Sequence, residues 1–398
     1  MAPKPPTHIF KRFTSTATTP LTITTKPTPS KSHLHLPIPR SSFPRGYVLS
    51  GIHAGIKKNP DIPDLAVILS ESPPLRTSAA ACFTRNAFKA APVLVSQEVL
   101  EKGGGRARAI VVNSGCANAV TGKKGMEDAW AMVRETDGLL KSLEKGAGET
   151  LVMSTGVIGQ NLPIKKIVEG IRSHSNRPNQ FPKPLSGDFG AWEDAARAFM
   201  TTDTFPKLRA RTFVIAGREY RMAGMDKGAG MIHPDMGPPS SFSSSTSGGL
   251  HATLLGCILT DVAISPRSLQ SALTYAVERS FNSISVDGDM STNDTIVVLA
   301  NGAAAASAGR VGMGRDEHVE WTGWENLEEI DEERDRASYE IFKEELTAFA
   351  IDLAKLVVRD GEGATKFVTV TVDVSPLPPT HPFFPDVFSR LSKLTDSL

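Results

Sequence analysis

The sequence predicts a mixed α/β (α+β) protein in which helices and sheets form layers. Short apolar runs typical of buried strands occur along the chain, for example at 65–70 and 295–300. Stretches with apolar residues at helical spacing lie between them, most clearly at 341–357. The chain has 398 residues, 40% of them hydrophobic, which is enough for a large core. Because strands and helices are interspersed without a solenoid-length repeat, a layered fold is expected.

Charge is distributed unevenly. The formal net charge is +1, but residues 1–60 hold nine Lys or Arg and no acid, which leaves 35 bases and 43 acids after them, a net of −8. We therefore expect no nucleic-acid partner for the body of the protein. No apolar run is long enough to cross a bilayer, so no membrane partner is expected either. Three scattered cysteines, Cys82, Cys116 and Cys257, indicate a reducing compartment.

The first 45 residues are expected to lie outside the folded body. They are rich in Ser, Thr and Pro, contain no acid and carry scattered Lys and Arg. This composition is typical of a mitochondrial transit peptide, whose positive charge follows the inside-negative membrane potential. A plain disordered tail is the alternative interpretation.

The elements of the first half follow from short local patterns. Strands are expected at 65–70, 108–113 and 150–153, with the last ending in the turn Ser154-Thr155-Gly156. Two segments, 79–83 and 93–95, are expected as short apolar stretches between loops. Helices are expected at 126–143 and 188–202, because their apolar residues fall on one face.

The centre of the chain is a loop that leads into a core strand. A glycine-rich loop, 226–236, is followed by a Pro/Ser/Gly-rich spacer and then by Ala252-Thr253. The apolar run 254–261 comes directly after, as a buried strand would. Thr253 therefore lies where a flexible loop meets a rigid strand, although a strand-start threonine is also common.

The second half continues with helix and strand patterns. Ser265-Pro266 is typical of an N-cap and a first-turn proline, and the helix is expected to run to Phe281. A strand at 295–300 and the helix at 341–357 follow. Residues 366–374 alternate strictly between apolar and polar, which predicts a sheet strand.

Thr253 is the candidate nucleophile. A threonine hydroxyl needs a base beside it, and the α-amino group of an N-terminal threonine can serve, since its pKa is roughly 7.7–8.0. Exposing that amine requires cleavage between Ala252 and Thr253. The hydroxyl can perform this step itself by attacking the Ala252 carbonyl, with water hydrolysing the resulting ester.

Four further positions are candidate site residues. Thr155 and Gly156 offer a hydroxyl and a backbone N–H that could stabilise an oxyanion, although an ordinary turn is the alternative. Lys227 could bind a substrate carboxylate or be a solvated lysine, and Glu362 could bind an amino group or be a turn carboxylate. The Lys227 loop does not match a phosphate-binding loop. His233 and His251 have no accompanying ligand set, so no metal is expected.

Several motifs, taken in order, resemble the bifunctional ornithine acetyltransferase/glutamate N-acetyltransferase family of arginine biosynthesis, in its fungal mitochondrial form. The similarity runs from about residue 46 to 372. The motifs are Phe83-Thr-Arg-Asn86, Lys89-Ala-Ala-Pro92, Asn113-Ser-Gly-Cys-Ala-Asn118, Ser154-Thr-Gly-Val-Ile-Gly159, Met200-Thr-Thr-Asp203, Lys227-Gly-Ala-Gly-Met231, Ala252-Thr-Leu-Leu-Gly256, Ser291-Thr-Asn-Asp294 and Glu362-Gly-Ala-Thr-Lys366.

The resemblance implies a helix–sheet–sheet–helix fold and an N-terminal-nucleophile threonine. It implies self-cleavage at Ala252-Thr253, with residues 46–252 as an α chain and 253–374 as a partial β chain. Thr253 would accept the acetyl group of N-acetylornithine and pass it to glutamate, with Thr155 and Gly156 stabilising the oxyanion. The substrate-binding residues would be Thr201, Lys227, Thr253 and Glu362.

The family context implied by the resemblance is a mitochondrial-matrix enzyme without a cofactor. Acetyl-CoA is an expected co-substrate, and the α and β chains are expected to assemble as a heterotetramer with two of each. Family members carry a longer C-terminal stretch after the strand that matches 366–374. Residues 375–398 look unrelated to it, so a truncated form is expected. An inactive remnant that acts only by binding, and a self-processing aminopeptidase, are the two alternatives.

Overall fold

The computed structural model describes residues 30–140, 148–174, 184–239, 254–311, 318–324 and 327–371. The strands are β1 (Tyr47–Ile52), β2 (Leu65–Ser70), β3 (Ser78–Thr84), β4 (Ala109–Cys116), β5 (Thr150–Val157), β6 (Lys207–Ile215), β7 (Arg218–Lys227), β8 (Met236–Gly237), β9 (Leu255–Thr260), β10 (Thr295–Ala300), β11 (Ser307–Val311) and β12 (His318–Thr322). The α-helices are α1 (Ala91–Lys102), α2 (Gly122–Asp137), α3 (Ile164–Arg172), α4 (Phe189–Phe199), α5 (Pro266–Glu278) and α6 (Arg336–Arg359), with 3-10 turns η1 (Ser32–Leu34), η2 (Arg40–Ser42) and η3 (Phe281–Ser283).

Two sheets carry the described fold. The first has four strands in the order β1-β2-β4-β5, with β4 and β5 parallel and the other pairs antiparallel. The second has six strands in the order β6-β7-β9-β10-β3-β8, in which β9 and β10 are parallel neighbours. A small pair, β11 and β12, stands apart. The mixed α/β class predicted from the sequence is confirmed.

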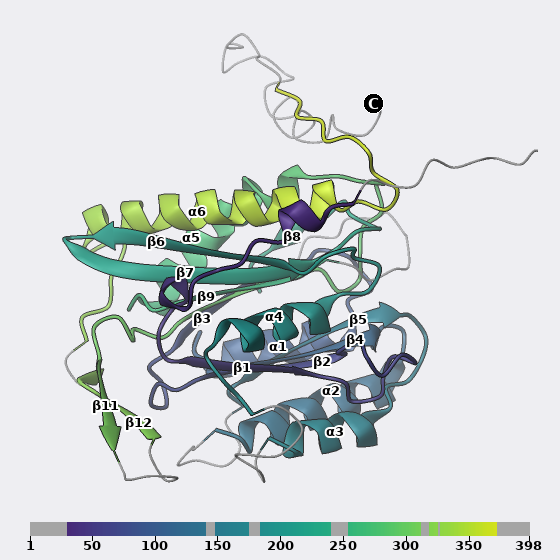
Figure 1. Cartoon of the computed structure of the whole chain (residues 1–398), viewed down its shortest axis with the longest axis horizontal. Coiled ribbons are helices and arrows are strands. Elements are labelled where there is room, and N and C mark those ends of the chain that lie inside the picture. Colours follow the sequence, from purple (N-terminus) through teal and green to yellow (C-terminus); the bar gives the residue numbers. More distant parts are fainter. Residues whose placement is uncertain are drawn as a thin grey trace, which may run out of the picture.

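Helices cover both sheets and also separate them. Figure 1 shows α5 and α6 over the outer face of the six-stranded sheet, α2 and α3 below the four-stranded sheet, and α1 and α4 between the two. The structure thus adds a middle helical layer to the arrangement that the resemblance implied. α4 packs so closely on β1 that a Cβ at Gly51 would lie 2.0 Å from the carbonyl oxygen of Asp194.

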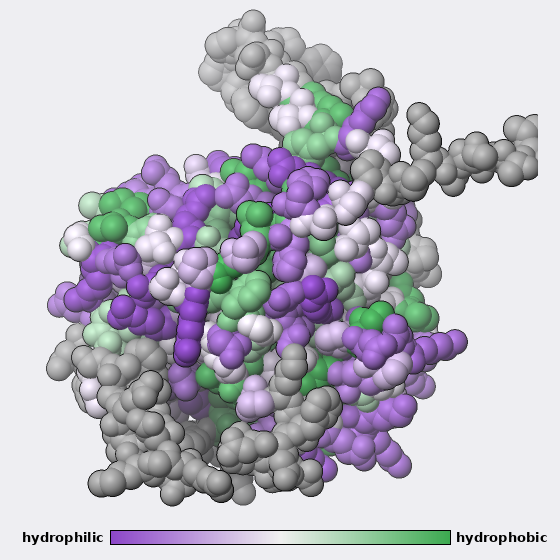
Figure 2. All heavy atoms as spheres, in the orientation of Figure 1, coloured by the Kyte–Doolittle hydropathy of each residue, from purple (hydrophilic) through white to green (hydrophobic). Residues whose placement is uncertain are grey.

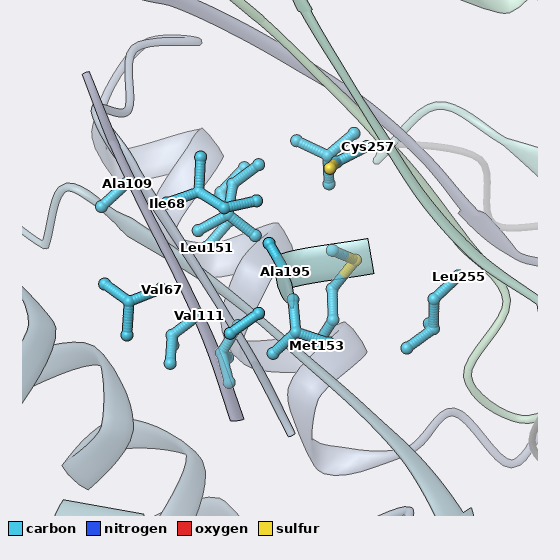
Figure 3. Packing of buried hydrophobic residues seen from close by; sticks show 14 of the residues in the cluster. Val67, Ile68, Ala109, Val111, Leu151, Met153, Ala195, Leu255 and Cys257 are labelled. Carbon is cyan, nitrogen blue, oxygen red and sulfur yellow. The ribbon is translucent and has the colours of Figure 1, made fainter. Parts of the chain in front are cut away.

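The inner faces of both sheets meet around this middle layer. Figure 3 shows Ile68 and Leu151 of the four-stranded sheet on one side, and Leu255 and Cys257 of β9 on the other. Ala195 of α4 lies between these two groups.

The outer surface is different, since Figure 2 shows mostly hydrophilic atoms on the visible face, with apolar atoms in scattered groups. Burial of the two sheets against shared helices is what fixes their relative position.

Several sequence predictions need correction. Residues 93–95 belong to α1, where Pro92 falls in the first turn and is compatible with the helix. β7 was missed, because its first half, Arg218 to Arg221, is polar and lies at the exposed end of the hairpin with β6. The segment Ser154–Gly156 is not a turn after β5 but part of it.

The strand predicted at 366–374 is also not seen. Residues 366–371 are described and form no strand, and Val368 and Val370 are 56% and 42% exposed. A strand needs a neighbour for its backbone groups, and the described residues provide none beside this segment, which leaves the body beyond α6 (Figure 1). Val372 and Val374 lie outside the described residues.

The prediction that residues 1–45 lie outside the body is wrong for 30–45. Phe43 is buried and stacks on Trp192 of α4, with ring centroids 4.6 Å apart. The ammonium of Lys31 lies 3.6 Å from the Asp360 carboxylate at the end of α6. Residues 1–29 lie outside the described residues, and the transit peptide stays a prediction.

Candidate active site

Lys227 links the two sheets at the candidate site. It is the last residue of β7 and pairs with Leu255 of β9. The side chain is fully buried, and its ammonium donates a hydrogen bond of 3.3 Å to Oγ1 of Thr155 in the four-stranded sheet. The interpretation of Lys227 as a solvated lysine is therefore wrong, and so is its placement in the loop. A lysine buried in this way requires polar partners.

Carboxylates around Lys227 supply that compensation. Burial lowers the pKa of the Lys227 ammonium, while the negative charges of Asp203, Asp294 and Glu362 oppose this shift. Asp203 accepts hydrogen bonds from the N–H of Gly228 at 2.8 Å and from the N–H of Thr201 at 2.9 Å. Thr201, predicted from the resemblance as a substrate contact, is thereby fixed beside the Lys227 strand.

Thr155 and Gly156 form the bulged end of β5. Thr155 pairs with Ser114 and Gly156 with Gly115, and the register shifts at Cys116. Gly156 has a φ of +122°, and a Cβ there would lie 2.4 Å from the carbonyl carbon of Gly115, so only glycine fits. Thr155 accepts from Lys227, which leaves its own O–H donor unused in that bond. The pair can stabilise a developing oxyanion.

Glu362 lies over the glycine-rich loop that follows Lys227. Its N–H donates to the carbonyl oxygen of Ala229 at 2.7 Å. A Cβ at Gly230 would lie 2.7 Å from the Glu362 carboxyl carbon, so the absence of a side chain there admits the carboxylate. Glu362 is exposed.

Thr253 and Ala252 lie outside the described residues. The described chain resumes at Leu254, whose N–H donates to Oδ1 of Asp294 at 2.9 Å. Asn293, the neighbour of Asp294, donates to the carbonyl oxygen of Ser154 at 2.8 Å. The first described residue after the predicted nucleophile is thus connected, through two consecutive side chains, to the residue that precedes Thr155.

A family model matches most of the chain. Residues 48–376 match the model of the ArgJ family. This chain belongs to the ArgJ family. It is 68% identical over 368 residues to the "Arginine biosynthesis bifunctional protein ArgJ, mitochondrial" of Coprinopsis cinerea, covering 92% of this chain and 71% of that relative. The protein with the same description from Laccaria bicolor is 64% identical over the same shares.

Solved structures with the same family name are also similar to this ArgJ-family chain. The crystal structure of "Arginine biosynthesis bifunctional protein argJ" from Bacillus halodurans has 34% sequence identity and a TM-score of 0.43. It covers 50% of this chain and 93% of that chain. The assignment to the family rests on the sequence matches and not on this overlay.

Sequence reasoning about the ArgJ-family chain missed Asp203, Asn293 and Asp294 as parts of the site. All three are buried polar residues, at 8%, 1% and 1% exposure. The available indication was the polar stretch 287–294 between two apolar segments, since a polar loop that enters a core must be bonded there. Thr201 and Lys207, which are near in sequence, bond Asp203, but its link to the site comes from the distant N–H of Gly228, which no local pattern shows.

The buried carboxyl group of Asp294 is expected to make the stability of the fold depend on pH. Burial raises its pKa to about 7, although the hydrogen bond from Leu254 lowers it. Between about pH 4 and 7 the folded ArgJ-family chain then holds a proton that the unfolded chain has lost, so the free energy of unfolding falls as pH rises. Asp294→Asn is expected to remove this slope, on the order of 4 kcal/mol across the window. Urea unfolding from pH 4 to 8 measures it, with exposed Asp289→Asn as the control; an unchanged slope in Asp294→Asn would contradict the shift.

Within the described parts of the ArgJ-family chain, no group of three or more His, Cys, Asp or Glu side chains could hold a metal ion. His233 Nδ1 lies 3.1 Å from the hydroxyl of Ser285, and His251 lies outside the described residues. Among the described helices, none is long and apolar enough to span a membrane.

Proposed function

We propose that this chain transfers an acetyl group from N-acetylornithine to glutamate, giving ornithine and N-acetylglutamate, after cleaving itself between Ala252 and Thr253. Membership of the ArgJ family supports the reaction, and the name of the relatives, bifunctional arginine-biosynthesis proteins, agrees with it. The single observation that carries the assignment of the site is the contact of Lys227 with Thr155 beside the start of β9.

Self-cleavage needs only groups of this chain and water. The Thr253 hydroxyl attacks the carbonyl carbon of Ala252 and its proton passes to the departing peptide nitrogen, so the amide becomes an ester. Water then hydrolyses the ester, which leaves a carboxylate on Ala252 and both a hydroxyl and an α-amine on Thr253. The new amine is the base that the hydroxyl requires for the transfer reaction.

Acetyl transfer follows in two similar steps. The Thr253 hydroxyl attacks the acetyl carbonyl of N-acetylornithine, ornithine leaves with the proton, and the acetyl group remains as an ester on Thr253. The amine of glutamate then attacks that ester, the bond to the Thr253 oxygen breaks, and the amine's proton restores the hydroxyl as N-acetylglutamate leaves. Both steps pass through an oxyanion. Thr155 and Gly156, at the bulged end of β5, are the proposed hydrogen-bond donors to it.

Substrate recognition is assigned to the charges around the site. Lys227 has an ammonium suited to the α-carboxylate that both substrates share. Its contact with Thr155 supports a carboxylate position close to the oxyanion donors. Glu362 is exposed above the glycine-rich loop and can receive an amino group. Thr201 is bonded to the Asp203 carboxylate, which also bonds Gly228, the residue after Lys227.

The cellular setting is part of the proposal. The relatives are described as mitochondrial, which supports a mitochondrial location, and we place this chain in the matrix. We also propose that cleaved α and β chains stay associated as a heterotetramer of two each, and that acetyl-CoA serves as a second acetyl donor.

The test is to purify the full chain and map its fragments. We expect two fragments, with the C-terminal one beginning at Thr253, together with formation of N-acetylglutamate from N-acetylornithine and glutamate. Intact mass and N-terminal sequencing identify the fragments, and mass spectrometry follows the products. A chain that stays whole and inactive favours a remnant that acts by binding. Cleavage with peptide hydrolysis but no acetyl transfer favours a self-processing aminopeptidase.

A further inference from the structure

The loop Ser291–Asp294, which leads into β10, contacts both halves of the candidate site. Its four residues are all polar and all nearly inaccessible, with exposures of 0%, 0%, 1% and 1%. Four consecutive buried polar residues are stable only when their groups are bonded. Their partners therefore show what the loop holds in place.

Asn293 is bonded to the four-stranded sheet. Its Nδ2 group donates to the carbonyl oxygen of Ala117 at 2.7 Å and to that of Ser154 at 2.8 Å. Its Oδ1 accepts from the hydroxyl of Thr292 at 2.7 Å. One amide group thus ties the end of β4 to the residue directly before Thr155. Because both N–H donors are used, the amide is held in one orientation.

Asp294 is bonded to the six-stranded sheet. Its Oδ1 accepts from the N–H of Leu254 at 2.9 Å, and the N–H of Thr295 donates to the carbonyl oxygen of Leu254 at 3.0 Å. Leu254 is thereby fixed at both its N–H and its C=O. Since a peptide unit is planar, fixing the Leu254 N–H also orients the peptide group that joins it to residue 253.

We propose that Asn293 and Asp294 are positioning residues that set the separation between the nucleophile and the oxyanion donors. Asn293 holds the Thr155 end of β5, and Asp294 holds the residue that follows Thr253. As consecutive residues they have Cα atoms about 3.8 Å apart, so the two attachments are joined by one short covalent span. The inference rests on the proposed function and adds to it the residues that align the two halves of the candidate site.

The experiment compares Asp294→Ala with Asp294→Asn in the full chain. Alanine removes the acceptor for the Leu254 N–H, whereas asparagine keeps an oxygen there. We expect Asp294→Ala to slow both self-cleavage and kcat by about 10- to 100-fold with KM within about threefold, since a small misplacement of reacting groups acts on rate. Asp294→Asn is expected to restore both rates to within about fivefold of the unchanged chain, as a neutral acceptor still bonds the N–H.

Asp289→Ala is the matched control, because Asp289 is an exposed acid in the same loop region. Circular dichroism and the thermal midpoint verify folding of each variant. Unchanged rates in folded Asp294→Ala would overturn the proposal, and so would equal losses in the alanine and asparagine variants, since the carboxylate would then act through its charge. If Asp294→Ala does not fold, a loss above 10-fold in folded Asp294→Asn overturns it. Failure of the proposed function is separate, because the unchanged chain itself would then not transfer acetyl groups.

Discussion

Replacing Thr253 with alanine is expected to leave the chain uncleaved and to abolish acetyl transfer. Alanine has no hydroxyl to attack the carbonyl of Ala252, so neither the ester nor the new α-amine forms. The same change removes the group that would carry the acetyl. Loss of a covalent nucleophile lowers kcat by on the order of 10⁴-fold or more in comparable acyl-transfer enzymes, close to the detection limit of most assays. Denaturing gels and product analysis measure both effects.

Thr253→Ser is the control for this prediction. Serine keeps the hydroxyl and, once cleaved, the adjacent amine, so two fragments and measurable transfer are expected. Fragments beginning at residue 253 in the alanine variant would show that another group cuts the chain. Transfer by uncleaved Thr253→Ala would show that the acetyl group never resides on this residue, and either result would remove the basis of the assignment.

The elements predicted well from the sequence are those whose pattern is local. β10 spans 295–300 in both the prediction and the structure, since a run of buried β-branched residues has few other uses. α5 begins as predicted, with the Ser265 hydroxyl accepting from the N–H of Ser268 and Pro266 in the first turn. Each signal lies within a few residues of the feature that it predicts.

The features that were missed depend on distant partners. Lys227 looks like a loop lysine until β7 pairs with β9 and places its side chain against Thr155 of the other sheet. The bulge at Gly156 exists only because β4 lies beside β5. Residues 366–371 show the opposite case, since strict alternation predicted a strand and the described chain offers no partner for it. The residue pattern of a segment shows which secondary structure it can form. Whether that structure forms depends on the segments that lie beside it in the fold.

The buried charge cluster of Asp203, Lys207 and Asp360 also depends on a partner that is distant in the sequence. It is expected to contribute to stability. Lys207, at the start of β6, donates to Oδ1 of Asp203 at 2.5 Å and to Oδ2 of Asp360 at 2.7 Å. All three side chains are fully buried. Burial would raise the pKa of Asp203, but the ammonium groups of Lys207 and Lys227 hold that pKa well below its usual range. Lys207 therefore bonds two buried carboxylates at once, and together with Lys227 it favours the ionised form of Asp203.

Lys207→Met is expected to lower the free energy of unfolding by about 3–5 kcal/mol, because two buried carboxylates would lose the ammonium that bonds both of them. Lys102→Met is the control, since its pair with Glu98 is exposed and a change within about 1 kcal/mol is expected. Urea unfolding at pH 7 in the uncleaved Thr253→Ala background compares them as single chains. The deficit of Lys207→Met should shrink toward pH 4, because Asp203, once it has lost the Lys207 ammonium, can take up a proton there. A deficit that is small at pH 7, or equal at both pH values, would mean that Lys207 is not what holds Asp203 ionised, and the rigid support under Thr201 and Lys227 would need another source.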